Sequence, residues 1–388
     1  MHNFILKELK NTDIKKEIEN IGFEKSYIEE ASKKYQYKNI KIFNLTNPQI
    51  HILKQTALSS GSDCATHRDV LISNIEKSDC ILTGSITQLL TIASKLEHQQ
   101  FGMQTLAHEI RKLCCAAPKP NRPKIMGILN LTPNSFSDGG LYNDFESAKN
   151  HLIEMIEDGA DIIDIGAEST KPYSKEVPSD EQIKKIVPIL KFIEENYPSR
   201  EFEISIDTRS AKVAEECIKY NVDYINDVSG LTHDNKMTEV IKNSGSKVII
   251  QHSKGTPENM QDNPHYENLM DEIFINLKEK TDFAISNGIK FENIIIDPGI
   301  GFGKTREDNF EIIRRIKEFY SMGYPMLLGI SRKSLLNLQE SSNEEKDIFT
   351  LALNTVAIAN NVDILRVHNV KLHKKFIDTL LDISVDNY

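Results

Sequence analysis

The sequence lacks the features that mark several large classes of protein. Its five cysteines form no Cys-x-x-Cys pair with matching histidines, and their odd number suits reduced thiols in a cytoplasmic protein rather than a zinc site. No stretch approaches the ~20 apolar residues of a membrane-spanning helix. An excess of positive charge is also missing, because the formal net charge is -10 and the pI is about 5.7. We therefore expect a cytoplasmic protein that binds neither nucleic acid nor membrane, although a local basic pocket could still hold a small anion.

A proline-rich segment indicates where the chain divides. Residues 115–123 contain three prolines within six positions, which disfavours helix and is typical of a semi-rigid linker. We predict a smaller α+β domain of unknown role at residues 1–118 and a larger domain at residues 119–388. The length of the second part suits a single barrel.

The first part shows a mixture of helical and strand patterns. Helices are expected around residues 13–35 and through 86–114, with a short strand at residues 40–43. Residues 59–68 and 82–85 are rich in small side chains and are compatible with turns or with anion-holding loops. Turns are favoured, because neither segment matches a phosphate-binding fingerprint with a lysine in place.

The second part alternates regularly between short apolar strands and helical segments. The strands are expected near residues 125–130, 161–166, 203–207, 224–227, 247–251, 293–297, 325–330 and 363–367. The helices between and after them are expected at residues 144–158, 180–196, 210–220, 234–244, 266–287, 306–321, 343–360 and 371–383. Eight such repeats predict an α/β fold of the closed (β/α)₈ TIM-barrel type, since an open doubly wound sheet more often stops at five or six strands.

Polar residues follow almost every predicted strand. In a TIM barrel the carboxyl ends of all strands meet at one face, where active sites are built. These strand ends carry Asn130, Asp164, Asp207, Asn226, His252, Asp297 and Arg366. A single Asp in such a position is often only a helix N-cap or a turn former. Seven polar strand ends around one mouth would leave many buried groups unpaired, so the set predicts a polar ligand.

The residue types at the mouth favour a flat heterocycle. Asp207, Asn226 and Asp297 can accept from and donate to the edge of a pterin or a purine, and Lys333 can meet a ring carbonyl or nitrogen. Phe302 lies in the glycine-rich segment 297–304 and is a candidate for packing on the ring, with plain loop anchoring as an equal alternative.

The last strand and the loop before it offer groups for anions. Arg366 and His368 alternate with Val367, so both should face the mouth, where they could bind a diphosphate or, for Arg366, stack on a ring. The alternative is a satisfied core histidine and a surface ion pair. Ser334 begins a helix and could meet a carboxylate, or it could be a simple N-cap.

Together these segments resemble the dihydropteroate synthases of folate biosynthesis. The resemblance covers residues from about 122 to 388 and rests on segments 127–140, 163–172, 206–208, 225–227, 297–304, 329–334 and 366–368. It implies condensation of 6-hydroxymethyl-7,8-dihydropterin diphosphate with 4-aminobenzoate, which gives 7,8-dihydropteroate and diphosphate. It also implies a homodimer.

The resemblance further implies the roles of individual residues. Pterin diphosphate would be bound by Thr170, Asp207, Asn226, Asp297, Phe302, Lys333, Arg366, Val367 and His368. Within that set Asp207, Lys333, Arg366 and His368 would carry the catalysis. The aminobenzoate site would comprise Phe136, Thr170, Lys171, Pro172 and Ser334. Asn130 would help to hold Mg²⁺ on the diphosphate, and residues 132–140 would close over the site as a lid.

Two departures from the family pattern concern the site itself. The family usually has Arg in place of Lys171, and an ammonium cannot make the same planar two-pronged contacts. Residues 251–253 read Gln-His-Ser where Met-His-Met is usual, which predicts a more polar pocket wall. Two rival functions therefore stay open: a methyltetrahydrofolate methyltransferase and a non-catalytic pterin-binding paralogue.

Overall fold

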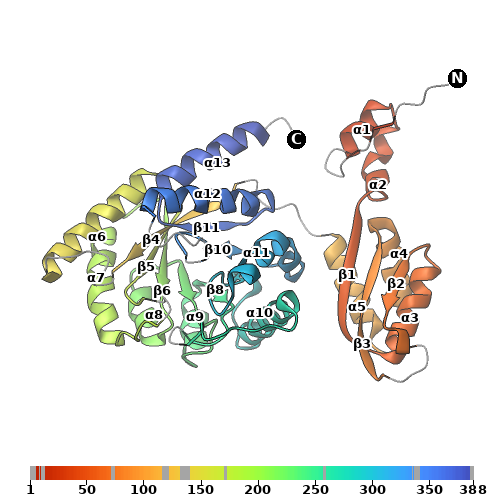
Figure 1. Cartoon of the computed structure of the whole chain (residues 1–388), viewed down its shortest axis with the longest axis horizontal. Helices are drawn as coiled ribbons and strands as arrows, with labels where there is room; N and C mark the ends of the chain where they lie inside the picture. Colours follow the sequence, from red (N-terminus) through yellow and green to blue (C-terminus); the bar gives the residue numbers. More distant parts are fainter. Residues whose placement is uncertain are drawn as a thin grey trace. The chain divides into compact units, whose positions relative to one another are not determined.

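The computed structural model describes residues 6–7, 9, 14–70, 75–115, 122–131, 140–169, 173–256, 259–333, 335 and 341–384. The chain divides into two compact units, Met1–Pro118 and Lys119–Asp386 (Figure 1). Within the described ranges, no helix is both long enough and apolar enough to span a bilayer.

The N-terminal unit is an α+β structure around a three-stranded antiparallel sheet. Its strands are β1 (Tyr37–Thr46), β2 (Asp63–Thr66) and β3 (Lys77–Ser85), in the order β1-β3-β2. Its helices are α1 (Ile14–Asn20), α2 (Ile28–Ser32), α3 (Asn47–Leu58), α4 (Ile86–Leu96) and α5 (Met103–Cys114), with short 3₁₀ turns at Lys25–Tyr27 and Arg68–Val70. Leu53, Leu82 and Leu89 lie in one buried cluster that draws on the sheet and the helices.

Two expectations for this unit were wrong in detail. The helical pattern at residues 86–114 is two helices, because Gly102 adopts a left-handed backbone (φ 73°) that ends the pattern before α5. The segments expected as turns contain strand β2 and the end of strand β3. Pairing across the sheet overrides the low strand propensity of their small residues, since β3 lies between two partners.

The second unit is a barrel of eight parallel strands, as predicted. The strands are β4 (Lys124–Asn130), β5 (Ile162–Gly166), β6 (Glu203–Asp207), β7 (Tyr224–Asp227), β8 (Lys247–Gln251), β9 (Ile294–Asp297), β10 (Leu327–Leu328) and β11 (Ile364–Val367). They pair in the order β10-β11-β4-β5-β6-β7-β8-β9, and a parallel bridge between Ile296 and Met326 joins the two ends of this order. The ring of strands identifies a (β/α)₈ TIM barrel.

A helical segment follows each strand of the barrel. These helices are α6 (Gly140–Glu157), α7 (Ser179–Asn196), α8 (Ala211–Ile218), α9 (Met237–Ser244), α10 (Leu269–Ser286), α11 (Arg306–Arg315), α12 (Asn343–Ala359) and α13 (Val370–Ser384). Short 3₁₀ segments lie at Phe291–Asn293 and Ile316–Met322. The predicted helices all occur, with ends displaced by a few residues.

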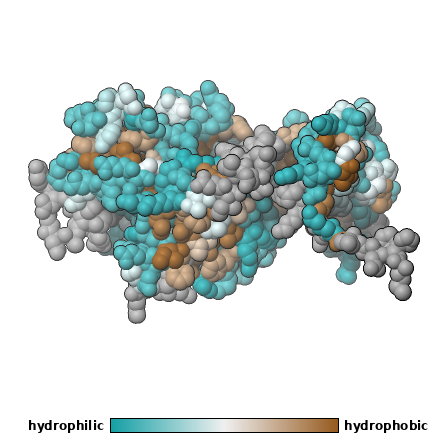
Figure 2. Space-filling view, turned by 90° about the horizontal axis from the view of Figure 1, so that it is seen from above, coloured by the Kyte–Doolittle hydropathy of each residue, from teal (hydrophilic) through white to brown (hydrophobic). Residues whose placement is uncertain are grey.

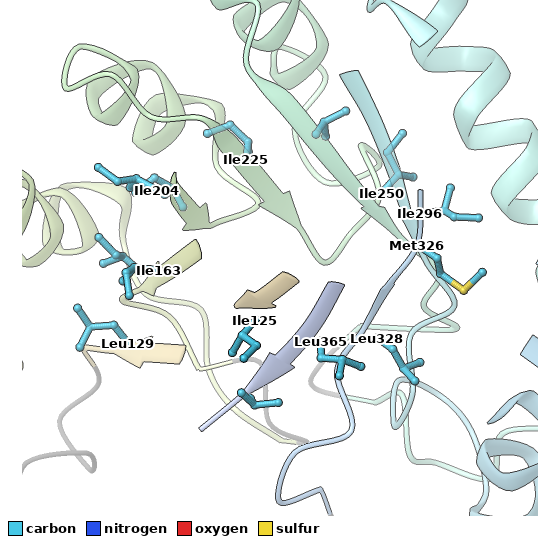
Figure 3. Packing of buried hydrophobic residues seen from close by; sticks show 14 of the residues in the cluster. Ile125, Leu129, Ile163, Ile204, Ile225, Ile250, Ile296, Met326, Leu328 and Leu365 are labelled. Atoms are coloured by element: carbon cyan, nitrogen blue, oxygen red, sulfur yellow. The ribbon is translucent and has the colours of Figure 1, made fainter. Parts of the chain in front are cut away.

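Side chains along the strands alternate between two buried environments. One set, which includes Ile163, Ile204 and Ile250, packs between the strands and the helices, and Figure 3 shows it on the outer side of the ring. The other set fills the barrel interior, where Met126 and Ile249 belong to a separate apolar cluster. Closer to the carboxyl ends of the strands, buried polar side chains such as Asp207, Asn226 and Asp297 replace the apolar ones.

Candidate active site

A hydrogen-bonded cluster of charged residues occupies the carboxyl end of the barrel. The Arg366 guanidinium donates from Nη2 to Asp207 (2.7 Å) and from Nε to Asp164 (2.5 Å). The Asn226 amide donates to the same oxygen of Asp164 at 3.1 Å. Strands β5, β6, β7 and β11 thus contribute one polar side chain each. Both carboxylates and the amide are buried, so these polar groups from four strands pair with one another rather than with water.

The electrostatics of the cluster depend on burial. Removal from water raises the pKa of Asp207 to about 7, even though Arg366 lowers it. Burial opposes the charge on Arg366, but Asp164 and Asp207 outweigh this effect and hold the pKa of the guanidinium above its usual value. The cluster therefore contains a permanently charged arginine beside a carboxyl that titrates near neutral pH.

Lys333 and Asp297 lie next to this cluster. Burial lowers the pKa of Lys333 to about 8, against the opposing effect of Asp297, and burial also raises the pKa of Asp297. The Lys333 ammonium donates to the Ile300 carbonyl and lies 4.5 Å from the centroid of the Phe302 ring. Phe302 is itself buried against Val228 and Met260.

The glycine-rich loop after β9 is held by side chains from several segments. Four successive carbonyls, those of residues 300–303, accept hydrogen bonds from Lys333, Gln261, Lys304 and Tyr266 respectively. At its start, the backbone N–H of Gly299 donates to Asp297 at 2.7 Å. The loop is therefore fixed beside Asp297 without any regular secondary structure.

The remaining predicted residues lie in different surroundings. Nδ1 of His368 lies 2.9 Å from the Ser331 hydroxyl, and Asn130 is half-buried at the end of β4. Val367 belongs to the core between strands and helices, so its side chain lies away from the mouth and only its backbone remains a candidate contact. Phe136, Lys171 and Ser334 fall outside the described residues, as do Thr170 and Pro172 and positions 132–139 of the lid.

Residues 251–253, where the chain departs from the family pattern, include a buried polar side chain. The Gln251 side-chain amide lies 3.5 Å from the Val228 carbonyl oxygen, a contact that a methionine would not make, and the Gln251 backbone carbonyl accepts from the buried Lys280 at 2.9 Å. His252 is also buried, and its Nδ1 lies 2.9 Å from the Lys304 ammonium. Burial, reinforced by Lys304, holds the pKa of His252 well below its usual value. The imidazole is therefore neutral and takes part in holding the loop.

Three side-chain contacts near the strand ends were not predicted from the sequence. Asp164 was noted as a strand end but received no role, although it binds both Arg366 and Asn226. Arg209 makes a two-pronged ion pair with Glu168, at 2.9 and 3.1 Å, beneath the loop after β5. Only the position of these residues after strands signalled them, because their partners are distant in the sequence.

The donor set around the mouth bears on the predicted Mg²⁺. In the described part of the chain, no group of three or more His, Cys, Asp or Glu side chains is arranged to hold a metal ion. Asn130 offers one amide oxygen near the mouth, and Mg²⁺ commonly takes one or two protein ligands together with substrate phosphates and waters. The amide oxygen of Asn130 therefore fits a metal ion that is held in part by a diphosphate.

Comparison with known proteins places this site in a family. The family described as "Pterin binding enzyme" matches residues 126–368. A dihydropteroate synthase of Clostridium beijerinckii is 44% identical over 251 residues, which cover 64% of this chain and 90% of that protein. The chain belongs to the dihydropteroate synthase family of pterin-binding enzymes. It is a transferase of folate biosynthesis.

A second relative extends the match to the N-terminal unit. A bifunctional dihydropteroate synthase/dihydropteroate reductase of Helicobacter pylori is 34% identical over 370 residues, which cover 95% of this chain and 96% of that protein. The region outside the barrel therefore also has a counterpart in a known member of the synthase family.

Solved synthase structures share the barrel. That of Clostridium difficile, determined in the presence of pteroic acid, has a TM-score of 0.63 and 39% identity and covers 69% of this chain and 99% of its own. That of Xanthomonas albilineans with 4-aminobenzoic acid has a TM-score of 0.62 and 30% identity, with coverage of 68% and 94%.

Proposed function

We propose that the mouth of the barrel condenses 6-hydroxymethyl-7,8-dihydropterin diphosphate with 4-aminobenzoate, with the residues named from the sequence as its site. The observation that carries this assignment is the hydrogen-bonded cluster of Asp207, Asn226 and Arg366 at the strand ends, in which Asp164 joins Asn226 to Arg366. A pterin edge would donate to and accept from these groups, and Asp297 and Lys333 would extend the same set. The loops with Phe136, Thr170, Lys171 and Pro172, together with Ser334, would form the aminobenzoate site.

In the proposed reaction, the bond between the exocyclic CH₂ and the diphosphate oxygen breaks and a bond from CH₂ to the aromatic amine forms. The amine loses one proton, and the electron pair of the broken bond leaves with the diphosphate. The dihydropterin ring stabilises positive charge at the CH₂ group, so no covalent enzyme nucleophile is required. Arg366 and His368 supply positive or donor groups near the leaving diphosphate.

A magnesium ion would serve this step by neutralising charge on the leaving diphosphate. Asn130 would be its protein ligand, through the amide oxygen at the end of β4. Because Asn130 contributes a single oxygen, the ion would bind with the substrate and leave with the product.

The test measures diphosphate release from the pterin diphosphate with Mg²⁺, with and without 4-aminobenzoate, together with identification of the pteroate product. Release that depends on both substrates supports the proposal, and the Asp207→Ala variant should lose pterin binding. Tight pterin binding without turnover would instead favour a non-catalytic pterin-binding protein. Methyl transfer from a methylated tetrahydrofolate would favour the methyltransferase.

A second candidate activity is reduction of the dihydropteroate product. The observation that favours it is the match to the bifunctional Helicobacter pylori protein across both units of this chain. Reduction would add a hydride and a proton, so a hydride donor, either a reduced nicotinamide or a reduced flavin, must be supplied. Formation of tetrahydropteroate from dihydropteroate with NADPH, alone or together with a flavin, would support it, and no tetrahydropteroate with either donor would refute it.

We also propose that the protein is a cytoplasmic homodimer with an accessory N-terminal domain. Ile348, Phe349 and Val356 expose large apolar side chains on α12, which suits a surface covered by a second copy. The face drawn in Figure 2 is mainly hydrophilic with several hydrophobic areas. Sedimentation should give the mass of a dimer, and Phe349→Asp should shift it toward the monomer; a monomeric wild-type protein would contradict this.

A further inference from the structure

Asp164 uses only half of its hydrogen-bonding capacity. The side chain is 0% exposed, and its Oδ2 accepts from both Arg366 and Asn226. Its Oδ1 is buried and has no hydrogen-bond partner among the described residues. A buried carboxylate oxygen without a partner loses its hydration and gains nothing in return, so such an atom calls for a physical explanation.

Arg366 also pairs in an unusual way, because it donates to two carboxylates rather than to both oxygens of one. A guanidinium matches one carboxylate through two parallel N–H groups. Other arginines of the barrel bind in this way: Arg332 contacts both oxygens of Asp347 at 2.7 Å, and Arg122 contacts both oxygens of Asp161 at 3.1 and 3.2 Å. The fork of Arg366 is instead divided between two carboxylates.

Because its N–H groups are divided in this way, Arg366 donates a hydrogen bond to Asp207, the residue proposed to bind the pterin. Nη2 of Arg366 donates to Oδ2 of Asp207 at 2.7 Å, and Asp207 is the proposed partner of the pterin N–H groups. A pterin N–H group that bonds to Oδ2 would therefore compete with Arg366 for Asp207. The unpaired Oδ1 of Asp164 belongs to the carboxylate that Arg366 already contacts through Nε.

We propose that Asp164 is a positioning residue that takes over Arg366 when the pterin binds. Arg366 would leave Asp207 and pair with both oxygens of Asp164, which frees Asp207 for the pterin. The exchange keeps two charge-assisted hydrogen bonds on the guanidinium and gives the unpaired oxygen a partner. The Arg366 charge would stay paired with Asp164 throughout, and the pterin N–H groups would replace the guanidinium as hydrogen-bond donors to Asp207. This inference rests on the proposed role of Asp207.

Asp164 would also fix the orientation of Asn226. The Asn226 amide donates its Nδ2 hydrogen to Asp164, so its Oδ1 is the atom left to accept from a ligand. The pocket would therefore present acceptors from Asp207, Asn226 and Asp297 and a donor from Lys333, a pattern suited to a ring with a donor-rich edge and a carbonyl.

The first experiment is the Asp164→Asn substitution, which keeps the size of the side chain but removes its charge. The probe is 6-hydroxymethyl-7,8-dihydropterin without diphosphate, measured by equilibrium binding. We expect about tenfold weaker binding, the scale of one hydrogen bond to a charged group. The KM for pterin diphosphate should rise about tenfold, while the KM for 4-aminobenzoate stays unchanged. Wild-type pterin affinity would overturn the proposal.

A double-mutant cycle distinguishes positioning from a general structural role. In an Arg366→Met background the competition for Asp207 no longer exists, so Asp164→Asn should then weaken pterin binding less than it does in the wild type, with only the loss through Asn226 remaining. Fully additive losses would overturn the proposal. If Asp164→Asn does not fold, Arg366→Lys serves instead, because an ammonium cannot span both oxygens of Asp164; it should weaken pterin binding about tenfold, and an unchanged affinity would overturn the proposal.

Two further variants complete the design. Asp161→Asn removes one partner of the ion pair with Arg122, which lies near the opposite end of the strands, and should leave pterin binding unchanged. A loss equal to that of Asp164→Asn would overturn the proposal. Asp207→Ala separates the proposed function from the proposed role of Asp164. If the Asp207→Ala variant binds the pterin normally, the proposed pterin site is wrong. If Asp207→Ala loses pterin binding while Asp164→Asn binds normally, only the role of Asp164 is rejected.

Discussion

At the scale of single residues, the site depends on charges held where water is largely absent. Burial raises the pKa of Asp207 to about 7 and lowers the pKa of Lys333 to about 8. Each shift disfavours the charged form, and yet the proposed recognition of the pterin requires an ionised Asp207 and a protonated Lys333. A narrow interval of pH satisfies both requirements.

We therefore expect a bell-shaped dependence of kcat/KM for pterin diphosphate on pH, with limbs near pH 7 and pH 8. As pH falls through about 7, Asp207 gains a proton and stops accepting; as pH rises through about 8, Lys333 loses its charge. Lys333→Arg should move the alkaline limb upward, because a guanidinium stays charged. Ionisation of the substrate affects the pH profiles of the variant and the wild type equally, so it does not contribute to their difference. An alkaline limb that does not move in Lys333→Arg would show that a group other than Lys333 titrates there.

A second prediction at this scale concerns Lys171. Its ammonium should attract the carboxylate of 4-aminobenzoate, so Lys171→Ala should raise the KM for 4-aminobenzoate by about 3–10-fold and leave that for the pterin unchanged. Lys171→Arg should lower the aminobenzoate KM through two-pronged contacts. Lys175→Ala, an exposed lysine in the same loop, is the matched control. Equal effects of the two alanine variants would argue against a specific contact.

At the scale of elements, the loop after β9 shows how an irregular segment is made rigid. Gly299 has a φ of 70°, and a Cβ atom added to it would lie 1.8 Å from the carbonyl oxygen of His252. Only glycine lets the loop pass this close to the end of β8. The backbone N–H of Gly299 also donates to Asp297, so a shift of the loop at Gly299 would displace a hydrogen bond of a proposed site residue.

Gly299→Ala should therefore damage both stability and pterin binding. Gly245→Ala is the control, because Gly245 has a similar φ of 73° but no atom within 4 Å of an added Cβ. The control should lose about 1 kcal/mol of unfolding free energy, the cost of a left-handed backbone alone. Gly299→Ala should lose more and raise the pterin KM. Thermal denaturation measures the stability and steady-state kinetics measure the KM. Equal losses of unfolding free energy in the two variants would mean that the loop accommodates the added Cβ atom without strain.

The elements themselves were predicted unequally. Barrel strands such as residues 203–207 were located to the residue, because continuous apolar runs between helical segments are local signals. In the N-terminal unit, strand β2 was missed. Its four residues include Asp63 and Ala65 and gain their extended form from pairing with β3, which begins 11 residues further along the chain.

At the scale of the whole molecule, the two units have separate hydrophobic cores. The cluster around Leu53 and Leu89 contains residues of the N-terminal unit only, and the clusters of the barrel contain none of them. Each core is built from its own elements, as expected of domains that can fold separately. The Clostridium beijerinckii relative corresponds to the barrel over 90% of its own length.

A chain of residues 119–388 should consequently retain the synthase activity. We expect its kcat/KM for both substrates to stay within about threefold of the full chain, because the proposed site uses barrel residues only. Steady-state kinetics on the two purified proteins provide the measurement, with thermal denaturation as a control for folding. Complete loss of activity in a folded barrel would show that the N-terminal unit contributes to the synthase reaction.

The sequence by itself determined the barrel and most of the polar strand ends, because apolar runs and the residues that follow them are local patterns. Tertiary structure alone decided the partners of those residues. Arg366 lies 202 positions from Asp164 and 159 from Asp207, and only closure of the ring brings the three together. Burial in that ring then raises the pKa of Asp207 and leaves one oxygen of Asp164 without a hydrogen-bond partner in the described part of the chain, and neither property has a signature in the linear chain.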